Sequence, residues 1–376
     1  MAMENEGDLP EKLRSARQAL GMSTRRVADA LSGSFSVSHA TIANYERGIT
    51  RPPIELLSAL ALLYERPVNW FLERSAALAN VHYRNLASKV RVRDRHQFEA
   101  VALKWLNAYV AIENRLGHPL SAEQKHDVAF KQKKPEDLAR EVRRKLGYEL
   151  LAPAPLPSVI EVLQAFGVRV LEQSTELRID GLAAQLGDEH VVVLNPLMPN
   201  DRGRMNAAHE LGHVLLGDCQ KESSAAKRKE EEKRAFAFAS HLLMPSRALN
   251  DAFDGQSMVR LVKWKERFGI SLAAMVYRAE QQRIITKSVA KKLWVEFGRR
   301  GWRSEEPGHV RPDRATRFEE IIDSAIVDRR ITMRQAAATA GVRSEELHER
   351  INLAMGIRTQ RNDGGDEPPV IPFSEA

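Results

Sequence analysis

One short stretch carries residues whose types and spacing could perform metal-dependent hydrolysis. The segment from Arg204 to Gly217 reads RMNAAHELGHVLLG and contains His209, Glu210 and His213 in the order HExxH. On a helix, residues i and i+4 lie about one turn apart on one face, so both imidazoles can bind one metal ion. Glu210 can then take a proton from metal-bound water and return it to a leaving amine. The spacing therefore predicts zinc-dependent cleavage of peptide bonds, with Glu210 as the catalytic base.

The residues around this motif favour a metal site over a helix whose polar groups only hydrogen-bond in a core. Apolar residues flank the motif at the spacing of a buried helix, and Gly212 keeps its second turn thin. Cys219 is the only cysteine, so any zinc must be held by histidine and carboxylate. Cys219 could sense oxidants, although a lone cysteine is more typical of a small core residue.

A third metal ligand is expected from the acidic run that precedes KRAFAFASHLLMP. Glu232 shares helical spacing with the apolar residues that follow, whereas Glu230 and Glu231 do not. We therefore expect Glu232 to lie on the buried stripe and to be the ligand. His241 and Tyr277 are alternative donors to a developing oxyanion, and the sequence favours neither; His241 lies nine residues after Glu232 and is expected to face elsewhere.

The elements that must position these residues can be read from the segments around them. The β-branched runs 167–173 and 190–196 predict strands, so a small sheet precedes the HExxH helix. The region 74–157 reads as helices with a basic surface around Arg91, and it ends in the proline-rich linker APAPLP. That basic surface could extend a nucleic-acid footprint or simply be solvated.

The first 72 residues have the pattern of a compact bundle of short helices. Gly21 ends a helix, and Ser23 and Ser38 are placed to cap the next two, the second of which is short and exposed. This is the plan that lays a recognition helix in the major groove. The alternative is a helical protein-binding module of the same shape.

This segment resembles the Xre/Cro-type helix-turn-helix regulators, with matching residues at 20–23, 27–28, 37–38, 41–42, 45–48 and 70–72. The turn SGSFS is longer than the family's usual glycine, and Thr24 replaces its common glutamine. By position, the resemblance implies that one set of residues approaches bases or phosphates and a second set the DNA backbone. The first set is Ser38, His39, Thr41 and Asn44, and the second is Thr24, Arg25 and Arg47.

The catalytic segment resembles the ImmA/IrrE family of zinc-dependent peptidases, through AHELGHVLL and the pattern E-x-x-A-x-x-F-A-x-x-L-L-M-P from Glu232 to Pro245. The resemblance implies Zn²⁺ on His209, His213 and Glu232, as in gluzincins. It also implies a repressor-like protein substrate in a stress, phage or mobile-element response. Phe236 departs from the family, which usually has a small polar residue there; if that group orients a ligand, the surroundings of the metal are altered.

Composition limits the number of domains, the location and the kind of partner that this chain can have. The chain has 376 residues, 43% of them hydrophobic, which suffices for two or three domains with cores of their own. No run of about 18 apolar residues occurs and residues 1–12 are polar, so we expect a cytoplasmic protein without a membrane span or signal peptide. The net charge of +7 favours a polyanionic partner such as double-stranded DNA.

The expected fold class is α+β, mostly α. The expected segments are a helix-turn-helix domain at 9–73, a helical connector at 74–157, a zincin-like metallopeptidase domain with a small sheet at 158–308, C-terminal helices at 309–358 and a disordered tail at 359–376. The C-terminal helices form either a helical hairpin or a second helix-turn-helix.

Three hypotheses follow for the whole chain. The first is a DNA-bound zinc endopeptidase, acting as a homodimer, that cleaves a regulatory protein. The second is a non-enzymatic Xre-type regulator whose peptidase-like domain senses a ligand or partner. The third is an antitoxin or phage-defence component.

Overall fold

The computed structural model describes residues 8–64, 66, 68–72, 78–84, 90–120, 128–148, 154–217, 225–255 and 257–354. Cys219 and the tail at 359–376 lie outside the described residues. The chain divides into two compact units, one made of residues 1–72 with 316–376 and the other of residues 73–315. The fold is mostly helical with one small sheet, as expected.

The first unit begins with short helices that pack around a common core. Ser23 and Ser38 each accept a hydrogen bond from the backbone N–H three residues on, which confirms both predicted caps. Gly21 follows the first helix with a positive φ, as a helix-ending glycine should. The core includes Val27, Ile42 and Leu60. The helices are α1 (Asp8–Ala19), α2 (Thr24–Leu31), α3 (His39–Glu46), α4 (Ile54–Leu63) and α5 (Val68–Leu72).

A charged pair fixes α3 against α1. The carboxylate of Glu46 accepts hydrogen bonds from Arg17 Nε at 2.6 Å and Arg17 Nη2 at 2.7 Å. Arg17 Nη1 also donates to the carbonyl oxygen of Met22, so one guanidinium ties both ends of the α2–α3 region to α1. The pair raises the pKa of Arg17, and no local pattern in the sequence indicates it.

The chain's last described helices belong to the same unit. They are α15 (Arg317–Val327), α16 (Met333–Ala340) and α17 (Ser344–Ala354). Thr332 and Gln335 form a capping box at the start of α16, and Gly341 ends it with a φ of 75°. Arg66 Nη1 donates to the carbonyl oxygens of Ala337 and Ala338, which joins these helices to the segment after α4.

The second unit is built on a mixed sheet with strand order β1-β3-β4-β2. β3 and β4 form an antiparallel hairpin, β2 is parallel to β4, and β1 is antiparallel to β3. β2 and β4 confirm the two strands predicted from the sequence. The strands are β1 (Leu78–Arg84), β2 (Arg169–Glu172), β3 (Gly181–Leu186) and β4 (Glu189–Leu194).

The expectation of helices throughout 74–157 was wrong for β1. Its sequence, LANVHYR, has no clear alternation of apolar and polar residues, and a bulge interrupts its pairing between Ala79 and His82. Pairing with β3, about a hundred residues later, makes this segment a strand, because hydrogen bonds of the sheet edge override weak local preference.

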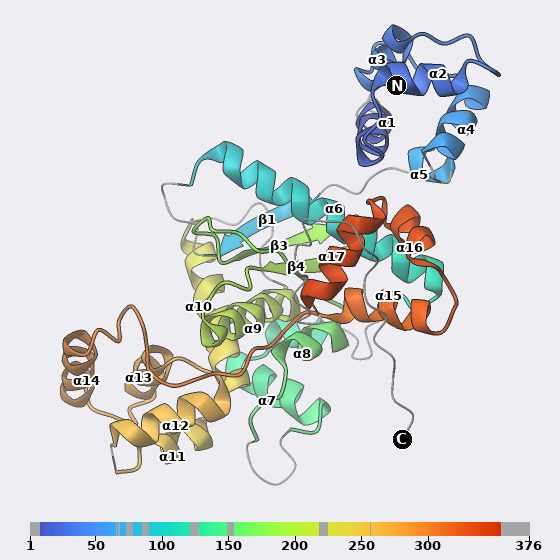
Figure 1. The fold of residues 1–376 in the computed structure, drawn as a ribbon. Helices are drawn as coiled ribbons and strands as arrows, with labels where there is room; N and C mark the ends of the chain where they lie inside the picture. The colour runs from blue at the N-terminus through green and yellow to red at the C-terminus, as the bar shows by residue number, and fades with distance from the viewer. Residues whose placement is uncertain are drawn as a thin grey trace, which may run out of the picture. The chain divides into compact units, whose positions relative to one another are not determined.

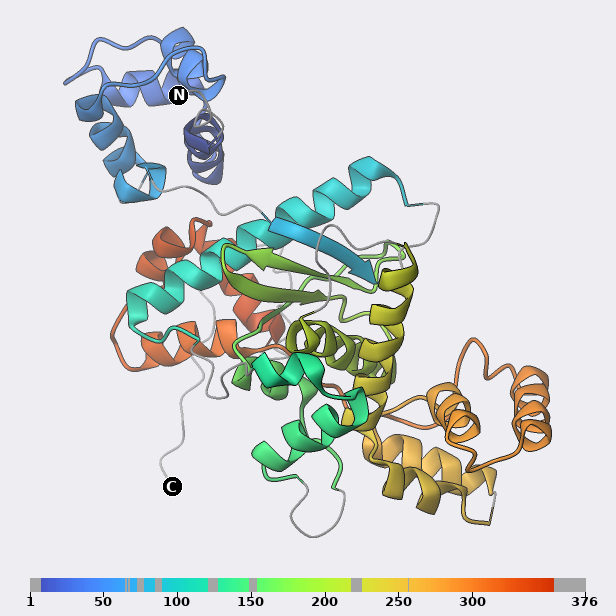
Figure 2. The same ribbon diagram turned by 180° about the vertical axis from the view of Figure 1, so that it is seen from behind.

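Helices lie on both sides of this sheet, with α6 on one side and α8 and α9 on the other (Figure 1, Figure 2). Tyr83 of β1 donates to Glu99 of α6 at 2.6 Å, and Arg169 of β2 donates to the buried Glu113 of α6 at 2.8 Å. α6 therefore crosses the sheet from one edge strand to the other. The bounds are α6 (Val92–Leu116), α7 (Pro135–Lys145), α8 (Val159–Ala165) and α9 (Asn200–Leu216), with a 3₁₀ turn at Val128–Gln132.

The rest of the unit packs beside α9. α9 and α10 share the main core through Leu211 and Leu215 on one helix and Phe238 and Leu242 on the other. In the described part of the chain, none of the helices combines the length and apolar character needed to cross a membrane. The remaining helices are α10 (Ala225–Leu243), α11 (Ser246–Phe253), α12 (Met258–Phe268), α13 (Leu272–Gln281) and α14 (Lys287–Arg299).

Candidate metal centre

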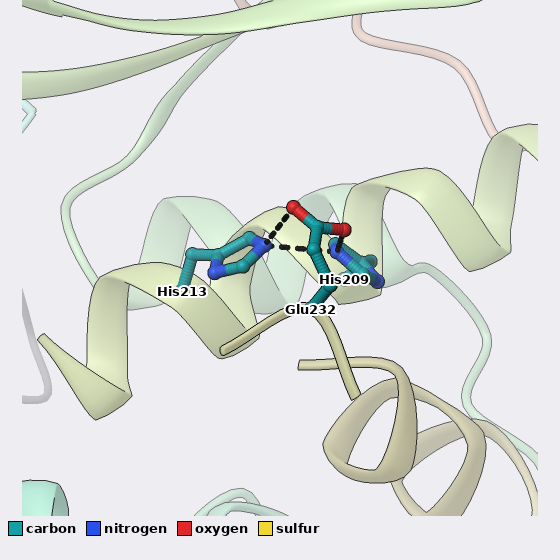
Figure 3. Close-up of side chains that lie close together, drawn as sticks. All are labelled: His209, His213 and Glu232. Atoms are coloured by element: carbon teal, nitrogen blue, oxygen red, sulfur yellow. Dashed lines mark hydrogen bonds and ion pairs between the residues drawn. The ribbon is translucent and has the colours of Figure 1, made fainter. Parts of the chain in front are cut away.

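The two histidines of HExxH lie on α9 with their side chains turned toward each other (Figure 3). α9 runs from Asn200 to Leu216 and ends at Gly217, which takes the left-handed conformation that closes a helix. His209 and His213 are one turn apart and both are buried. Their Nε2 atoms lie 2.9 Å from each other, so the two rings present their outer nitrogens to the same point.

Glu232 of α10 reaches this point from the second helix. Its Oε2 lies 3.2 Å from His209 Nε2, and its Oε1 lies 3.5 Å from His213 Nε2. The expectation that Glu232 sits on the buried stripe was wrong, because its side chain is 52% exposed whereas that of Glu231 is 7% exposed. The buried face of α10 runs through Glu231, Ala235, Phe238 and Leu242, so Glu231 occupies the buried position, and Glu232 lies beside that face.

The donor set fits a zinc ion. These three side chains form a cluster of ligand atoms that all lie within 4.8 Å of one another. Tetrahedral zinc with bonds of about 2.0–2.1 Å places its ligand atoms about 3.3 Å apart. The separations of 2.9, 3.2 and 3.5 Å bracket that value. Two imidazoles and one carboxylate leave a fourth position for water, as catalytic zinc requires.

Glu210 follows the first histidine on α9 and is only 3% exposed. Burial removes a carboxylate from bulk water, which strengthens its interaction with a nearby proton donor. Its position beside His209 on the helix that carries both imidazoles suits a base that acts on a molecule held at the cluster.

Buried ion pairs hold the first turns of α9. Arg204 donates to Asp313 at 2.8 Å and to the carbonyl oxygen of Leu156 at 2.7 Å. Asp313 also accepts from Ser158 and from the backbone N–H of Val159, so it caps α8 as well.

A second buried network also fixes the beginning of α9. Lys265 of α12 pairs with Asp201 at 2.8 Å and with Glu306 at 2.9 Å. Sequence reasoning missed all of these residues, because their partners lie far along the chain and no local motif marks them.

The two alternative oxyanion donors are placed differently. His241 Nδ1 lies 2.8 Å from the carbonyl oxygen of Ala237, and its Nε2 lies 2.8 Å from Gln282 Nε2. These contacts describe a neutral imidazole that donates through Nδ1 and accepts through Nε2, and burial lowers its pKa to about 4. Tyr277 stacks edge to face on Phe236 with ring centroids 5.7 Å apart.

The predicted DNA-contacting residues are accessible on α2 and α3. Arg25, Ser38, His39 and Arg47 are exposed, and Thr24, Thr41 and Asn44 are half-buried. The Ser38 hydroxyl lies 2.9 Å from that of Thr41, and Arg47 donates to Asn44 Oδ1 at 2.7 Å. These polar groups are thus held in place before any DNA is bound, and their contacts with DNA remain a prediction.

Two family models match the chain. Residues 13–71 match the helix-turn-helix model, and residues 163–280 match the M78 peptidase model, described as an IrrE N-terminal-like domain. The chain joins a helix-turn-helix domain to an IrrE-like peptidase domain. The helix-turn-helix match covers α1 to α5, and the peptidase match includes the HExxH helix, α10 and Tyr277. None of the curated proteins matches this chain.

Proposed function

We propose that the chain is a zinc-dependent endopeptidase attached to a DNA-binding domain, and that it cleaves a repressor-like regulatory protein. The convergence of His209, His213 and Glu232 within an M78 peptidase domain carries this proposal. The presence of Glu210 beside these ligands supports catalysis over sensing, since a purely structural metal site does not need that carboxylate.

The residues of the site have distinct roles in the proposed reaction. His209, His213 and Glu232 would hold zinc, which when bound acts as a Lewis acid and acidifies water. Glu210 accepts the proton from the attacking water on its carboxylate and later delivers it to the leaving amine. The ion pairs of Arg204 and Lys265 keep α9 in place, so the two imidazoles and Glu210 keep their geometry during turnover.

The DNA-binding half supplies the regulatory context of the proposal. A helix-turn-helix domain supports binding to double-stranded DNA. We propose that the protein binds as a homodimer to two-fold related half-sites, and that the cleaved repressor belongs to a stress, phage or mobile-element response. Two-fold binding is the usual arrangement for this motif, with half-sites about one helical turn apart.

The decisive experiment compares the full chain with Glu210→Gln. The variant is expected to keep about one zinc per chain and the fold, and to lose cleavage of a repressor substrate by about two orders of magnitude or more. His213→Ala serves as the control that loses both zinc and cleavage. If Glu210→Gln regulates its target genes as the parent does, the domain is a sensor on a peptidase scaffold and the proposal fails.

DNA binding is tested separately from catalysis. Alanine at Thr41 and Asn44 should weaken binding to the specific site by about 1–3 kcal/mol for each base-specific interaction that is removed, while binding to unrelated DNA changes little. Salt titrations on both DNAs measure the specific and the non-specific binding free energies. A parent protein that binds all sequences alike would contradict the helix-turn-helix assignment of these residues.

A further inference from the structure

A large cavity of about 710 Å³ opens in the second unit beside α9 and α10. It lies among the start of α9, Phe236 of α10, α12 to α14, and the segment from residue 302 to residue 310. Its volume falls in the range of cavities that bind ligands. None of the residues that line it is a proposed metal ligand or the proposed base.

The cavity begins one helical turn from the metal ligands on both helices. Met205 precedes His209 by four residues, and Phe236 follows Glu232 by four residues; both line the cavity. One turn corresponds to about 5.4 Å along a helix axis. Residues of an extended peptide are about 3.4 Å apart, so a side chain one or two positions from a bond held at the cluster reaches the cavity.

Aromatic side chains give the cavity an apolar wall. Phe236 and Tyr277 meet edge to face at an interplanar angle of 80°, and Trp294 and Trp302 also line the space. Tyr277 is 47% exposed, so its ring is accessible to a ligand that enters the cavity.

The buried charged groups of the lining are already paired. Lys265 is 3% exposed and contacts both Asp201 and Glu306. Glu306 in addition accepts hydrogen bonds from the backbone N–H groups of Leu272 and Ala273 at the start of α13. An entering apolar side chain therefore does not strip Lys265 of its partners, and the other charged residues of the lining, Arg202, Arg303 and Glu305, are exposed to water.

We propose that this aromatic cavity selects the substrate, by binding a large apolar side chain close to the bond that is cleaved. The proposal rests on the proposed peptidase function and specifies its substrate class as an extended segment with an aromatic or leucine-sized residue beside the scissile bond. Phe236 is the specificity-determining wall, since it is the lining aromatic residue on a helix that carries a metal ligand.

The test uses the full-length Glu210→Gln protein loaded with zinc, so that peptides bind without being cut. Two series of peptides place alanine, leucine, phenylalanine or lysine on either side of a fixed central bond. Binding is measured by calorimetry and by intrinsic tryptophan fluorescence, to which Trp294 and Trp302 of the cavity contribute. The phenylalanine and leucine peptides should bind about ten- to a hundredfold more tightly than the alanine peptide, on one side of the bond only.

Phe236→Ala in the same background should reduce that preference to about threefold or less, by the same reasoning on apolar pockets, while zinc content and binding of the alanine peptide stay unchanged. Phe236→Leu should retain most of it. Val295→Ala, an exposed α14 residue outside the lining set, serves as the control and should change nothing.

The outcomes separate the two proposals. If the parent cleaves peptides with no preference for apolar residues, or if Phe236→Ala leaves the preference intact, the cavity is not the subsite and the peptidase function stands. If apolar peptides bind with the expected preference but the parent cleaves none of them, the cavity proposal stands and the peptidase proposal fails.

Discussion

A methyl group added at Gly212 should move the metal ligands of α9 away from the ligand of α10. Gly212 lies in the middle of α9 between Leu211 and His213, and it faces α10. A Cβ added here would lie 3.0 Å from Phe238 Cδ1 and 3.1 Å from Ala235 Cα. Ordinary carbon contacts need about 3.5–4.0 Å, so α9 and α10 must move apart by roughly half an ångström.

That displacement acts directly on the metal site, because Glu232 is carried by α10 and both histidines by α9. Metal-ligand distances tolerate deviations of about 0.2 Å. We therefore expect Gly212→Ala to weaken zinc binding by about ten- to a hundredfold, the range found when the supports of a site are disturbed. The stability of the metal-free protein should change less, since overpacking costs about 1–3 kcal/mol and the loss of a helical glycine restores about 1 kcal/mol.

Gly203→Ala is the matched control. Gly203 lies on the same helix, and no atom comes within 4 Å of an added Cβ there. This variant should gain about 0.5–1 kcal/mol of stability and bind zinc as the parent does. Competition with a chromophoric chelator measures the zinc affinity, and urea unfolding of the metal-free proteins measures stability. Equal zinc affinities for the two alanine variants would refute the idea that the α9–α10 spacing sets the metal geometry.

Three further outcomes are expected from buried polar groups. The folded-state pKa of His241 is about 4, below its unfolded value near 6.5, so its contribution to stability is complete above pH 6.5 and is lost as pH falls toward 4. At about pH 5.5 the free energy of unfolding of the metal-free parent should therefore fall by about 1 kcal/mol more than that of His241→Gln, measured by urea unfolding. Glu46→Gln leaves the Arg17 guanidinium without its carboxylate and should destabilise the helix-turn-helix by about 3 kcal/mol. Glu55→Gln on the exposed face of α4 is the control, and equal unfolding midpoints for the two variants would contradict the role of the pair. Asp313→Asn should lower both stability and zinc occupancy, and unchanged zinc content would show that α9 does not depend on this anchor.

Local signals in the sequence were enough to locate the chemistry. HExxH fixes the relation of His209 and His213 through helical periodicity, and Glu232, the carboxylate chosen from the acidic run, is the one that meets the histidines. The caps at Ser23 and Ser38 are equally local, since each hydrogen bond spans three residues. The expected burial of Glu232 was nevertheless wrong, because Glu231 takes the buried position, and apolar spacing did not separate two carboxylates that both lie about one turn before Ala235.

Long-range contacts could not be predicted in the same way. β1 becomes a strand only by pairing with β3, and nothing in its own residues specifies that partner. Arg17 and Glu46 lie 29 residues apart on different helices. One sequence without its relatives gives no sign that two distant charged residues meet. An arginine or a glutamate looks the same in the sequence whether it is exposed or buried in an ion pair.

The anchor between Arg204 and Asp313 spans 109 residues of chain, and this separation matters for a protein made from its N-terminus. At ordinary rates of translation, the ribosome needs roughly 5–20 s to go from one residue to the other. Until then the nascent HExxH helix has neither its buried counter-charge nor the cap of α8 that the same carboxylate supplies. The anchoring of the candidate metal centre thus waits for nearly all of its unit to be synthesised.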